Sequence, residues 1–150
     1  MSNETVFTDE TLHTVSDIEK NLRYISGIIK QKGREILSQY TITPPQFIAL
    51  QWLLEDGDMT IGELSNKMFL ACSTTTDLVD RMEKSLLVMR VKDDKDRRVV
   101  RIHLQDKGER MIAEVIEKRQ MYLQNVLNGF SIDEIGLLKN QLEKLYLEMK

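Results

Sequence analysis

Two clusters of side chains in the middle of this 150-residue chain have the chemistry needed to bind a polyanion. The first is a run of four hydroxyl residues at 73–76. The second is the segment 84–101, where seven lysines and arginines stand against three aspartates, a local charge of +4 in a chain of net charge −3. Hydroxyls hydrogen-bond to phosphates and base edges, and cations neutralise phosphates. Because the basic excess is local, it indicates a specific surface feature and not a bias of the whole composition.

The hydroxyl run would lie on the second helix of a helix-turn-helix. A first short helix is expected over 60–68, because Thr60 and Glu63 have the spacing of a capping box and an apolar stripe follows at helical spacing. A turn over 69–72 leads to a second helix that starts near Ser73, with one of the four hydroxyls as its N-cap. The apolar edge of that helix is narrow and consists of Leu78, Val79 and Met82.

The basic segment would lie on a β-hairpin. Residues 88–92 and 99–104 are short β-branched runs that read as antiparallel strands, and the charged residues 93–98 form the tip between them. A polar-faced helix beside a basic hairpin is the arrangement of a winged helix-turn-helix, whose helix enters the major groove of DNA while an arginine of the wing reaches a minor groove. The same residues also fit a solvated hairpin on an α+β domain, but their order and spacing favour DNA binding.

These segments resemble the MarR family of bacterial transcriptional regulators. The resemblance rests on residues 64–68, on 73–83 and most specifically on 96–108, which is similar to the family's Asp-x-Arg wing followed by a strand and a helix start that ends in glycine. It extends over most of the chain. The resemblance implies an obligate homodimer with one winged helix-turn-helix per protomer, bound to a palindromic operator. It also implies that Arg98 enters the minor groove and that Asp96 braces the wing.

The predicted DNA-binding residues come from both clusters. Most basic side chains of the wing are expected to contact phosphates, which supply affinity and salt dependence without sequence information. Arg98 would otherwise form a surface ion pair with Asp96 or Asp94, which contributes little energy. Arg81 is expected to contact DNA, or to pair with Asp77 one turn earlier and with the wing. The predicted set is Ser73, Thr74, Thr75, Thr76, Arg81, Lys92, Lys95, Arg97 and Arg98.

Four positions depart from the pattern of the family. Asp77 stands where relatives often carry a basic residue, and its carboxylate would accept from a cytosine amino group but repel phosphate. Leu86 stands where glycine commonly ends the recognition helix, so the leucine must either be strained or end the helix differently. Phe69 replaces a commonly smaller or polar residue in the turn, and Gln105 replaces a threonine that caps the next helix.

Long amphipathic helices flank the winged segment. An apolar stripe runs along residues 8–40 and is too long for one small domain to cover, so part of it is expected to contact another subunit. Further stripes follow over 106–149, where Ser131 opens the last helix with a capping box. We therefore expect one domain over 1–150, mainly α with a small β-wing. Its dimerisation helices are 8–40 and 106–149, and its winged helix-turn-helix is 43–104.

The composition argues against several other classes of protein. One cysteine and two separated histidines provide neither a disulfide framework nor a metal site, and no cofactor is expected. No glycine-rich phosphate loop or nucleophile–base pair suggests catalysis, so an enzyme is not predicted. The polar, acidic start and the lack of long apolar runs predict a cytoplasmic chain without membrane contact. Cys72, beside the recognition helix, is interpreted as a small structural residue, although a helix N-terminus can activate a thiol.

The sequence thus predicts a sequence-specific DNA-binding transcriptional regulator. We expect a dimeric repressor of the MarR type on double-stranded DNA, with a small-molecule effector that shifts the separation of the two recognition helices. One alternative is a helical enzyme or ligand carrier that uses the same inter-domain cleft. Another is a protein-interaction module that has lost DNA binding, for which the acidic Asp77 and Asp80 are the best support.

Overall fold

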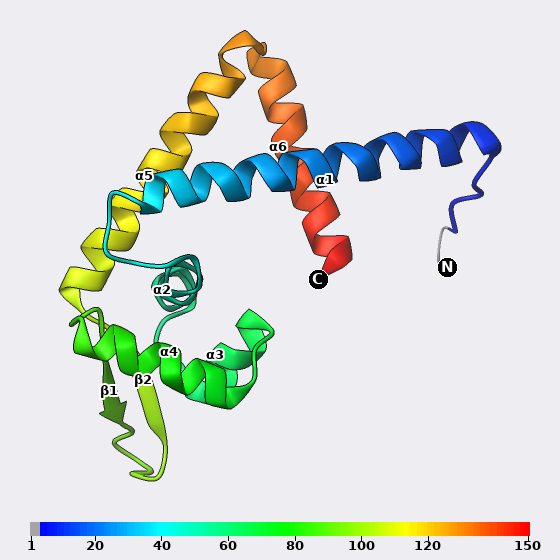
Figure 1. Ribbon diagram of the computed structural model, residues 1–150. Helices are drawn as coiled ribbons and strands as arrows, with labels where there is room; N and C mark the ends of the chain where they lie inside the picture. The colour runs from blue at the N-terminus through cyan, green and yellow to red at the C-terminus, as the bar shows by residue number, and fades with distance from the viewer. Residues whose placement is uncertain (1–3) are drawn as a thin grey trace.

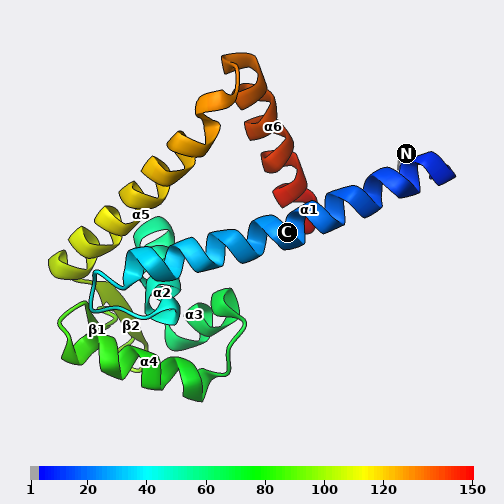
Figure 2. The same cartoon turned by 45° about the horizontal axis from the view of Figure 1, so that its top comes forward.

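The computed structural model describes residues 4–150 and is mainly helical, with one two-stranded sheet (Figure 1). The predicted fold class is confirmed. A winged unit, which runs from α2 to β2, lies at one end, and α1, α5 and α6 extend away from it as an open triangle (Figures 1 and 2). In chain order the elements are α1 (Asp9–Leu37), α2 (Pro44–Asp56), α3 (Ile61–Met68), α4 (Cys72–Lys84), β1 (Val88–Lys92), β2 (Val100–Leu104), α5 (Asp106–Val126), the 3-10 helix η1 (Leu127–Gly129) and α6 (Ile132–Met149).

Capping boxes start three of the helices, and those at Thr60 and Ser131 lie where the sequence pattern predicts them. Thr43, Thr60 and Ser131 each accept a hydrogen bond from the backbone N–H three residues later, and the Gln or Glu there accepts the N–H of the cap in return. Each box satisfies two helix-end donors that the helix itself leaves unpaired. The helix α1 is shorter than expected, because it ends at Leu37 and its last carbonyl accepts from Tyr40 in a tight turn.

The sheet is an antiparallel hairpin of β1 and β2, in register from Val88 opposite Leu104 to Lys92 opposite Val100. A third short segment pairs with it, because Met59 and Ile102 exchange two backbone hydrogen bonds of 3.3 and 2.6 Å. This bridge ties the hairpin to the loop between α2 and α3. It is absent from the sequence-based prediction, because a single bridging residue has no periodicity to detect.

The hydrophobic core lies in the winged unit, and only one end of α1 and one end of α5 contribute to it. In α1 only Ile36 and Leu37 are buried, and no residue of α6 is buried in the described chain. The buried apolar side chains are Ile36, Leu37, Ile42, Ala49, Leu50, Leu53, Met59, Leu64, Val79, Met82, Leu87, Val88, Ile102, Ile112 and Val115. The single chain therefore builds a complete core around the helix-turn-helix and leaves the outer helices uncovered.

Two non-glycine residues with positive φ end the two helices of the helix-turn-helix. Phe69 follows α3 with φ 54°, and Leu86 lies between α4 and β1 with φ 62°. Both are exposed, Phe69 at 95% and Leu86 at 60%. Leu86 thus reaches the left-handed conformation that a glycine would adopt there without strain. Of the two outcomes considered for Leu86, the strained one is observed.

A glycine is required where α5 begins. A Cβ placed on Gly108 would lie 2.3 Å from the carbonyl oxygen of Leu87, a distance that real contacts do not allow. The same carbonyl accepts the backbone N–H of Gln105, which is the N-cap of α5 but makes no side-chain cap. Instead, the Gln105 amide donates to the Val88 carbonyl at 3.3 Å. The start of α5 is therefore packed directly against the exit of α4.

Candidate nucleic-acid interface

The recognition helix α4 is fixed to the core by one face. Thr75, Val79 and Met82 recur at helical spacing and are all 0% exposed. The Thr75 hydroxyl donates to the Ala71 carbonyl at 3.1 Å. The prediction that Thr75 contacts DNA is therefore wrong for this structure, because the side chain has no exposed surface. The spacing of Thr75 from Val79 was the signal that could have revealed it.

The hydroxyl run does not cap the helix, which corrects a second expectation. The helix α4 begins at Cys72 with Ala71 as its N-cap, and no side chain caps it. Thr76 is half-buried, and its hydroxyl donates to the Cys72 carbonyl at 2.9 Å. Ser73 and Thr74 are exposed. Only these two hydroxyls are thus directed to solvent in the first turn of the helix.

The outward face of α4 continues from Ser73 through Asp77 and Arg81 to Lys84, all exposed. The ion pair predicted between Arg81 and Asp77 does not form among the described residues. The link between α4 and the wing comes from Arg90 of β1, whose guanidinium lies 2.6 Å from Asp80 and 2.9 Å from Glu83. Sequence reasoning overlooked Arg90, because its partners lie seven and ten residues away in another element.

Asp96 organises the tip of the wing, as the resemblance implies. Its carboxylate accepts from the backbone N–H and from Nε of Arg98, both at 3.1 Å, and from a terminal guanidinium nitrogen at 3.2 Å. These hydrogen bonds lower the pKa of Asp96 below its usual value. The Asp93 side chain accepts the Asp96 N–H at 3.0 Å. The Arg98 side chain is held through its guanidinium, in the ion pair with Asp96 given above as the alternative to a groove contact, and remains 91% exposed.

Three other basic side chains surround this arginine. Lys92, Lys95 and Arg97 are exposed, and within the described residues 4–150 none of them has an acidic partner within 4.0 Å. Arg101, by contrast, lies farther down the hairpin at 4.0 Å from Glu63 and 3.8 Å from Asp93. The hairpin therefore presents these three cations to solvent together with the exposed Arg98.

Two polar residues that could suggest chemistry are engaged in local contacts. The Cys72 thiol is exposed and lies 3.3 Å from the hydroxyl of Ser65. His103 pairs through Nδ1 with Asp58 at 2.8 Å on the surface. Among residues 4–150 no group of three or more His, Cys, Asp or Glu side chains could hold a metal ion. In the same part of the chain, no helix is long and apolar enough to cross a membrane.

Two cavities lie where α1 and α5 join the winged unit. One of about 370 Å³ is bordered by residues of α1, α2 and α5, including Leu37, Phe47 and Ile48. A second of about 240 Å³ lies between α1 and α5. Arg119 borders both cavities, and its guanidinium stacks over the Phe47 ring at 5.3 Å. The linings are mainly apolar, with Arg119 in both, Lys30 and Arg34 at the larger cavity and Lys32 at the smaller one.

A polar helix face beside a basic-tipped hairpin defines this protein as a winged helix-turn-helix protein. The chain belongs to the MarR family, whose sequence profile matches residues 42–100. It is 65% identical over 143 residues to the uncharacterized HTH-type transcriptional regulator YsmB of Bacillus subtilis, with 95% of this chain and 98% of YsmB covered.

Solved structures agree with this assignment. A MarR family protein from Bacillus stearothermophilus is 62% identical, with a TM-score of 0.89 over 95% of this chain and 99% of that one. The transcriptional regulator Tm0710 of Thermotoga maritima is 33% identical, with a TM-score of 0.71 over 89% and 94% of the two chains. The relatives are named as transcriptional regulators and not as enzymes, which places this chain in the class of DNA-binding regulators.

Proposed function

We propose that this protein is a homodimeric repressor that binds a palindromic operator through one recognition helix and one wing per protomer. The observation that carries the proposal is the 91% exposed Arg98 at the wing tip, whose guanidinium is oriented by Asp96. MdtR of Bacillus subtilis, 28% identical over 81% of this chain, is named a transcriptional repressor. A chain that acts on bacterial operators works in the cytoplasm.

The residues take different parts in the proposed contact. Ser73, Thr74 and Arg81 lie on the face of α4 that would enter the major groove, where they contact base edges and phosphates. Thr76 lies at the margin of that face, with its hydroxyl already bonded. Arg98 reaches the minor groove. The phosphate contacts come from the free cations of the wing tip, Lys92, Lys95 and Arg97.

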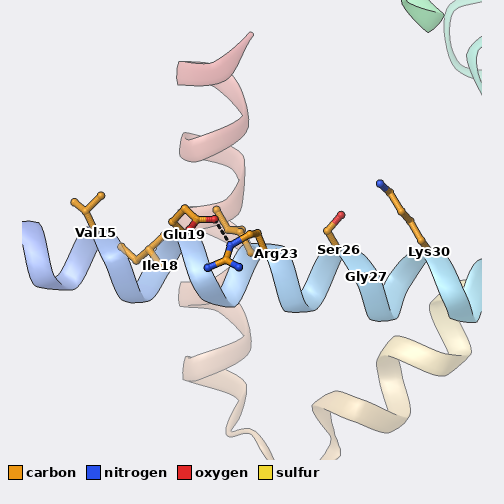
Figure 3. Close-up of a pocket in the computed structure, with 8 residues that line it drawn as sticks. Val15, Ile18, Glu19, Arg23, Ser26, Gly27 and Lys30 are labelled. Atoms are coloured by element: carbon orange, nitrogen blue, oxygen red, sulfur yellow. Dashed lines mark hydrogen bonds and ion pairs between the residues drawn. The ribbon is translucent and has the colours of Figure 1, made fainter.

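The dimer would form through α1, α5 and α6. Large apolar side chains are exposed along all three helices, for example Ile18 at 49%, Val126 at 50% and Leu142 at 51%. Figure 3 shows part of this surface, a groove of about 600 Å³ on α1 that includes Val15 and Ile18. A second copy that covers these faces gives a two-fold axis, and a two-fold axis matches a palindrome. A MepR variant from S. aureus, which has this fold at 24% identity and a TM-score of 0.64, has been solved bound to an oligodeoxyribonucleotide.

The cavities beside Arg119 are the proposed effector site. Mainly apolar walls with several cations at their border suit a small apolar molecule that carries an anionic group. NadR, with this fold at 24% identity and a TM-score of 0.65, has been solved in complex with 4-hydroxyphenylacetate. Because the cavities lie at the junction of α1, α2 and α5, a ligand there would favour one angle between the winged unit and the dimer helices.

The alternative of a module without DNA binding loses part of its support. It rests on the acidic Asp77 and Asp80, but Asp80 forms an ion pair with Arg90 at 2.6 Å. Asp77 remains as the one unpaired acid on the outward face of α4 in the described chain. An isolated carboxylate there fits a contact to a cytosine amino group as well as it fits a protein partner.

Selection of bound duplexes from a random pool tests the proposal. We expect a palindrome with half-site centres about 34–36 Å apart, and an affinity that falls steeply with salt. Arg98→Ala should weaken binding by about 1–3 kcal/mol and relax sequence preference at one position. Lys144→Ala, which removes one positive charge in α6 and outside the winged unit, is the matched control. Equal binding of all duplexes, or unchanged affinity of Arg98→Ala, contradicts the proposed readout.

A further inference from the structure

We propose that Arg90 is a positioning residue for DNA binding, which locks the wing onto the recognition helix and offsets part of the charge of Asp80 and Glu83. The inference rests on the proposed use of α4 and the wing as one DNA-binding surface. Arg90 lies in β1, and both of its partners lie in α4. It is not one of the side chains expected to contact DNA, so its role would be exerted through the elements it joins.

The contacts of Arg90 fix both its backbone and its side chain. The Glu83 carboxylate accepts the backbone N–H of Arg90 with one oxygen and a guanidinium nitrogen with the other, both at 2.9 Å. The other terminal nitrogen donates to Asp80 at 2.6 Å. Partial burial opposes the charged guanidinium, but these hydrogen bonds and charges outweigh it and raise the pKa of Arg90. Three hydrogen bonds thus join one strand residue to two successive turns of the recognition helix.

The contacts of Arg90 join α4 and β1 across the short connection where the backbone alone would allow the two elements to rotate. Only the short segment 85–87 connects α4 to β1, and Leu86 within it has a φ of 62°. On the inner side, Met82 and Val88 are buried in the core. On the solvent side, the ion pairs of Arg90 with Asp80 and Glu83 link β1 to α4 in the described part of the chain. The helix and the wing must reach different grooves of one duplex, so their relative angle decides whether both contacts can form.

Charge gives Arg90 a second role. The helix α4 carries three acids, Asp77, Asp80 and Glu83, against the two bases Arg81 and Lys84, so its own charge is −1. Arg90 supplies the one further positive charge that brings this group to zero. Without it, two uncompensated carboxylates on the recognition helix would approach the phosphates of the duplex and repel them.

The geometry requires arginine in particular. The planar guanidinium presents nitrogens to two carboxylates at once, whereas a lysine has a single nitrogen on a flexible stem. The side chains are 29% exposed for Arg90, 49% for Asp80 and 40% for Glu83. Ion pairs open to solvent to this extent contribute little to overall stability. The arrangement therefore serves the angle and charge of the interface more than the folding of the chain.

The test compares Arg90→Met with Arg90→Lys and with the triple variant that adds Asp80→Asn and Glu83→Gln. We expect Arg90→Met to weaken binding to the selected operator by about tenfold or more, with a small change in Tm and an unchanged dimer. Arg90→Lys should be intermediate, because it keeps the charge and loses the fork. The triple variant should recover part of the lost affinity, because it removes the uncompensated carboxylates. Arg101→Met, whose ion pairs are longer, should have a smaller effect.

The salt dependence separates positioning from direct contact. A phosphate-binding arginine removes about one unit from the slope of log affinity against log salt when it is replaced. Arg90→Met should change that slope by less than one unit, and the triple variant should reverse the change. A slope reduced by one, with no recovery in the triple variant, would make Arg90 a phosphate contact and overturn the proposal. Wild-type affinity in Arg90→Met would overturn it as well.

A measurement without DNA keeps the inference independent of the proposed function. Amide hydrogen exchange in β1 and β2 should rise in Arg90→Met while the amides of α2 stay protected. Unchanged exchange in the hairpin would show that Arg90 does not hold the wing. If the wild-type protein bound no duplex, the proposed function would fail, and the exchange experiment would still decide whether the lock exists.

Discussion

The winged unit and the triangle of long helices differ in how much of their structure one chain completes. Leu64, Val79 and Ile102 are 0% exposed inside the winged unit. Within α6, by contrast, Leu142 and Leu147 remain 51% and 64% exposed, and no residue of that helix is buried. Both regions carry amphipathic helices. The difference teaches that an apolar stripe predicts burial but does not say whether the covering surface belongs to the same chain.

The two regions also divide the work of the protein. The self-sufficient unit carries the groups with DNA-binding chemistry, held by short hydrogen bonds such as those of Arg98 and Arg90. The incomplete region carries exposed apolar stripes among charged side chains, with surface ion pairs such as Glu19 with Arg23. A binding site needs side chains in fixed positions, and a core within the same chain can hold them there. A dimer interface instead needs apolar surface that the single chain leaves exposed.

The largest effect is expected from charges in the incomplete region. Leu138→Lys combined with Leu142→Lys should convert the dimer to a monomer, because burial of four leucines across two copies contributes about 6 kcal/mol. Sedimentation velocity measures the change directly. The winged unit should keep its helical signal but bind the operator much more weakly, since one protomer holds one half-site. A dimer that persists in this variant would break the comparison.

A truncation inside the winged unit provides the contrast. Leu64→Ala should cost about 2–5 kcal/mol of unfolding free energy at any protein concentration, because the cavity lies within one chain. For substitutions in the dimer interface, the apparent free energy of unfolding should instead depend on the protein concentration.

Substitution of one glycine in each region compares their packing, with a smaller expected effect on stability. Gly108→Ala forces a Cβ against the Leu87 carbonyl and should destabilise the protein by about 2–3 kcal/mol in chemical denaturation. Gly136→Ala is the matched control in α6, where nothing lies within 4 Å of the added atom in the single chain. It should stabilise the protein by up to about 1 kcal/mol through helix propensity. Equal destabilisation by both variants would mean that the partner packs as tightly on Gly136 as the Leu87 carbonyl does on Gly108.

Phe69→Gly should have an effect of opposite sign. The phenylalanine has a φ of 54° and is 95% exposed, so it adds strain and almost no packing within one chain. Glycine removes the strain, and we expect about 1 kcal/mol more stability in denaturant unfolding. The matched substitution Leu86→Gly tests the same strain at φ 62°. A loss of stability in Phe69→Gly would show that its ring packs on something outside the single chain.

The smallest effect concerns the pH dependence of the wing tip. The Arg98 hydrogen bonds favour the charged carboxylate of Asp96 and so lower its pKa from the ordinary value of 3.8. The order that they provide is therefore complete above that value and lost only as the pH falls through the lowered pKa. NMR signals of the Arg98 side chain should stay constant from neutral pH to about 5. In Asp96→Asn they should already show a mobile side chain at neutral pH.

The sequence was informative wherever one local pattern decides the structure. The capping boxes at Thr60 and Ser131 formed as predicted, because each depends on residues three apart. The hairpin followed from its period of two, and its observed β2 begins one residue later than expected. Asp96 and Arg98 are two residues apart, and their contact also formed.

The sequence-based prediction failed where the structure depends on the rotational phase of a helix or on contacts between residues far apart in the chain. Four consecutive hydroxyl residues cover the whole circumference of a helix, so at least one had to face the core, and that one is Thr75. The cap of α4 is Ala71, which has no side-chain signal to detect. Arg81 looked like the link to the wing on spacing alone, but the partner that reaches α4 is Arg90, which the fold brings close from the next strand.

The length of α1 has a mechanical consequence. Its last residues, Ile36 and Leu37, are embedded in the winged unit, while its other end lies far out along the triangle (Figure 2). Its 29 residues span about 43 Å, so the helix behaves as a lever whose short end is clamped beside the cavities. A swing of about 5° displaces the far end by about 4 Å. A ligand bound in the cavities at the clamped end of α1 would thus change the distance between the winged units of two protomers.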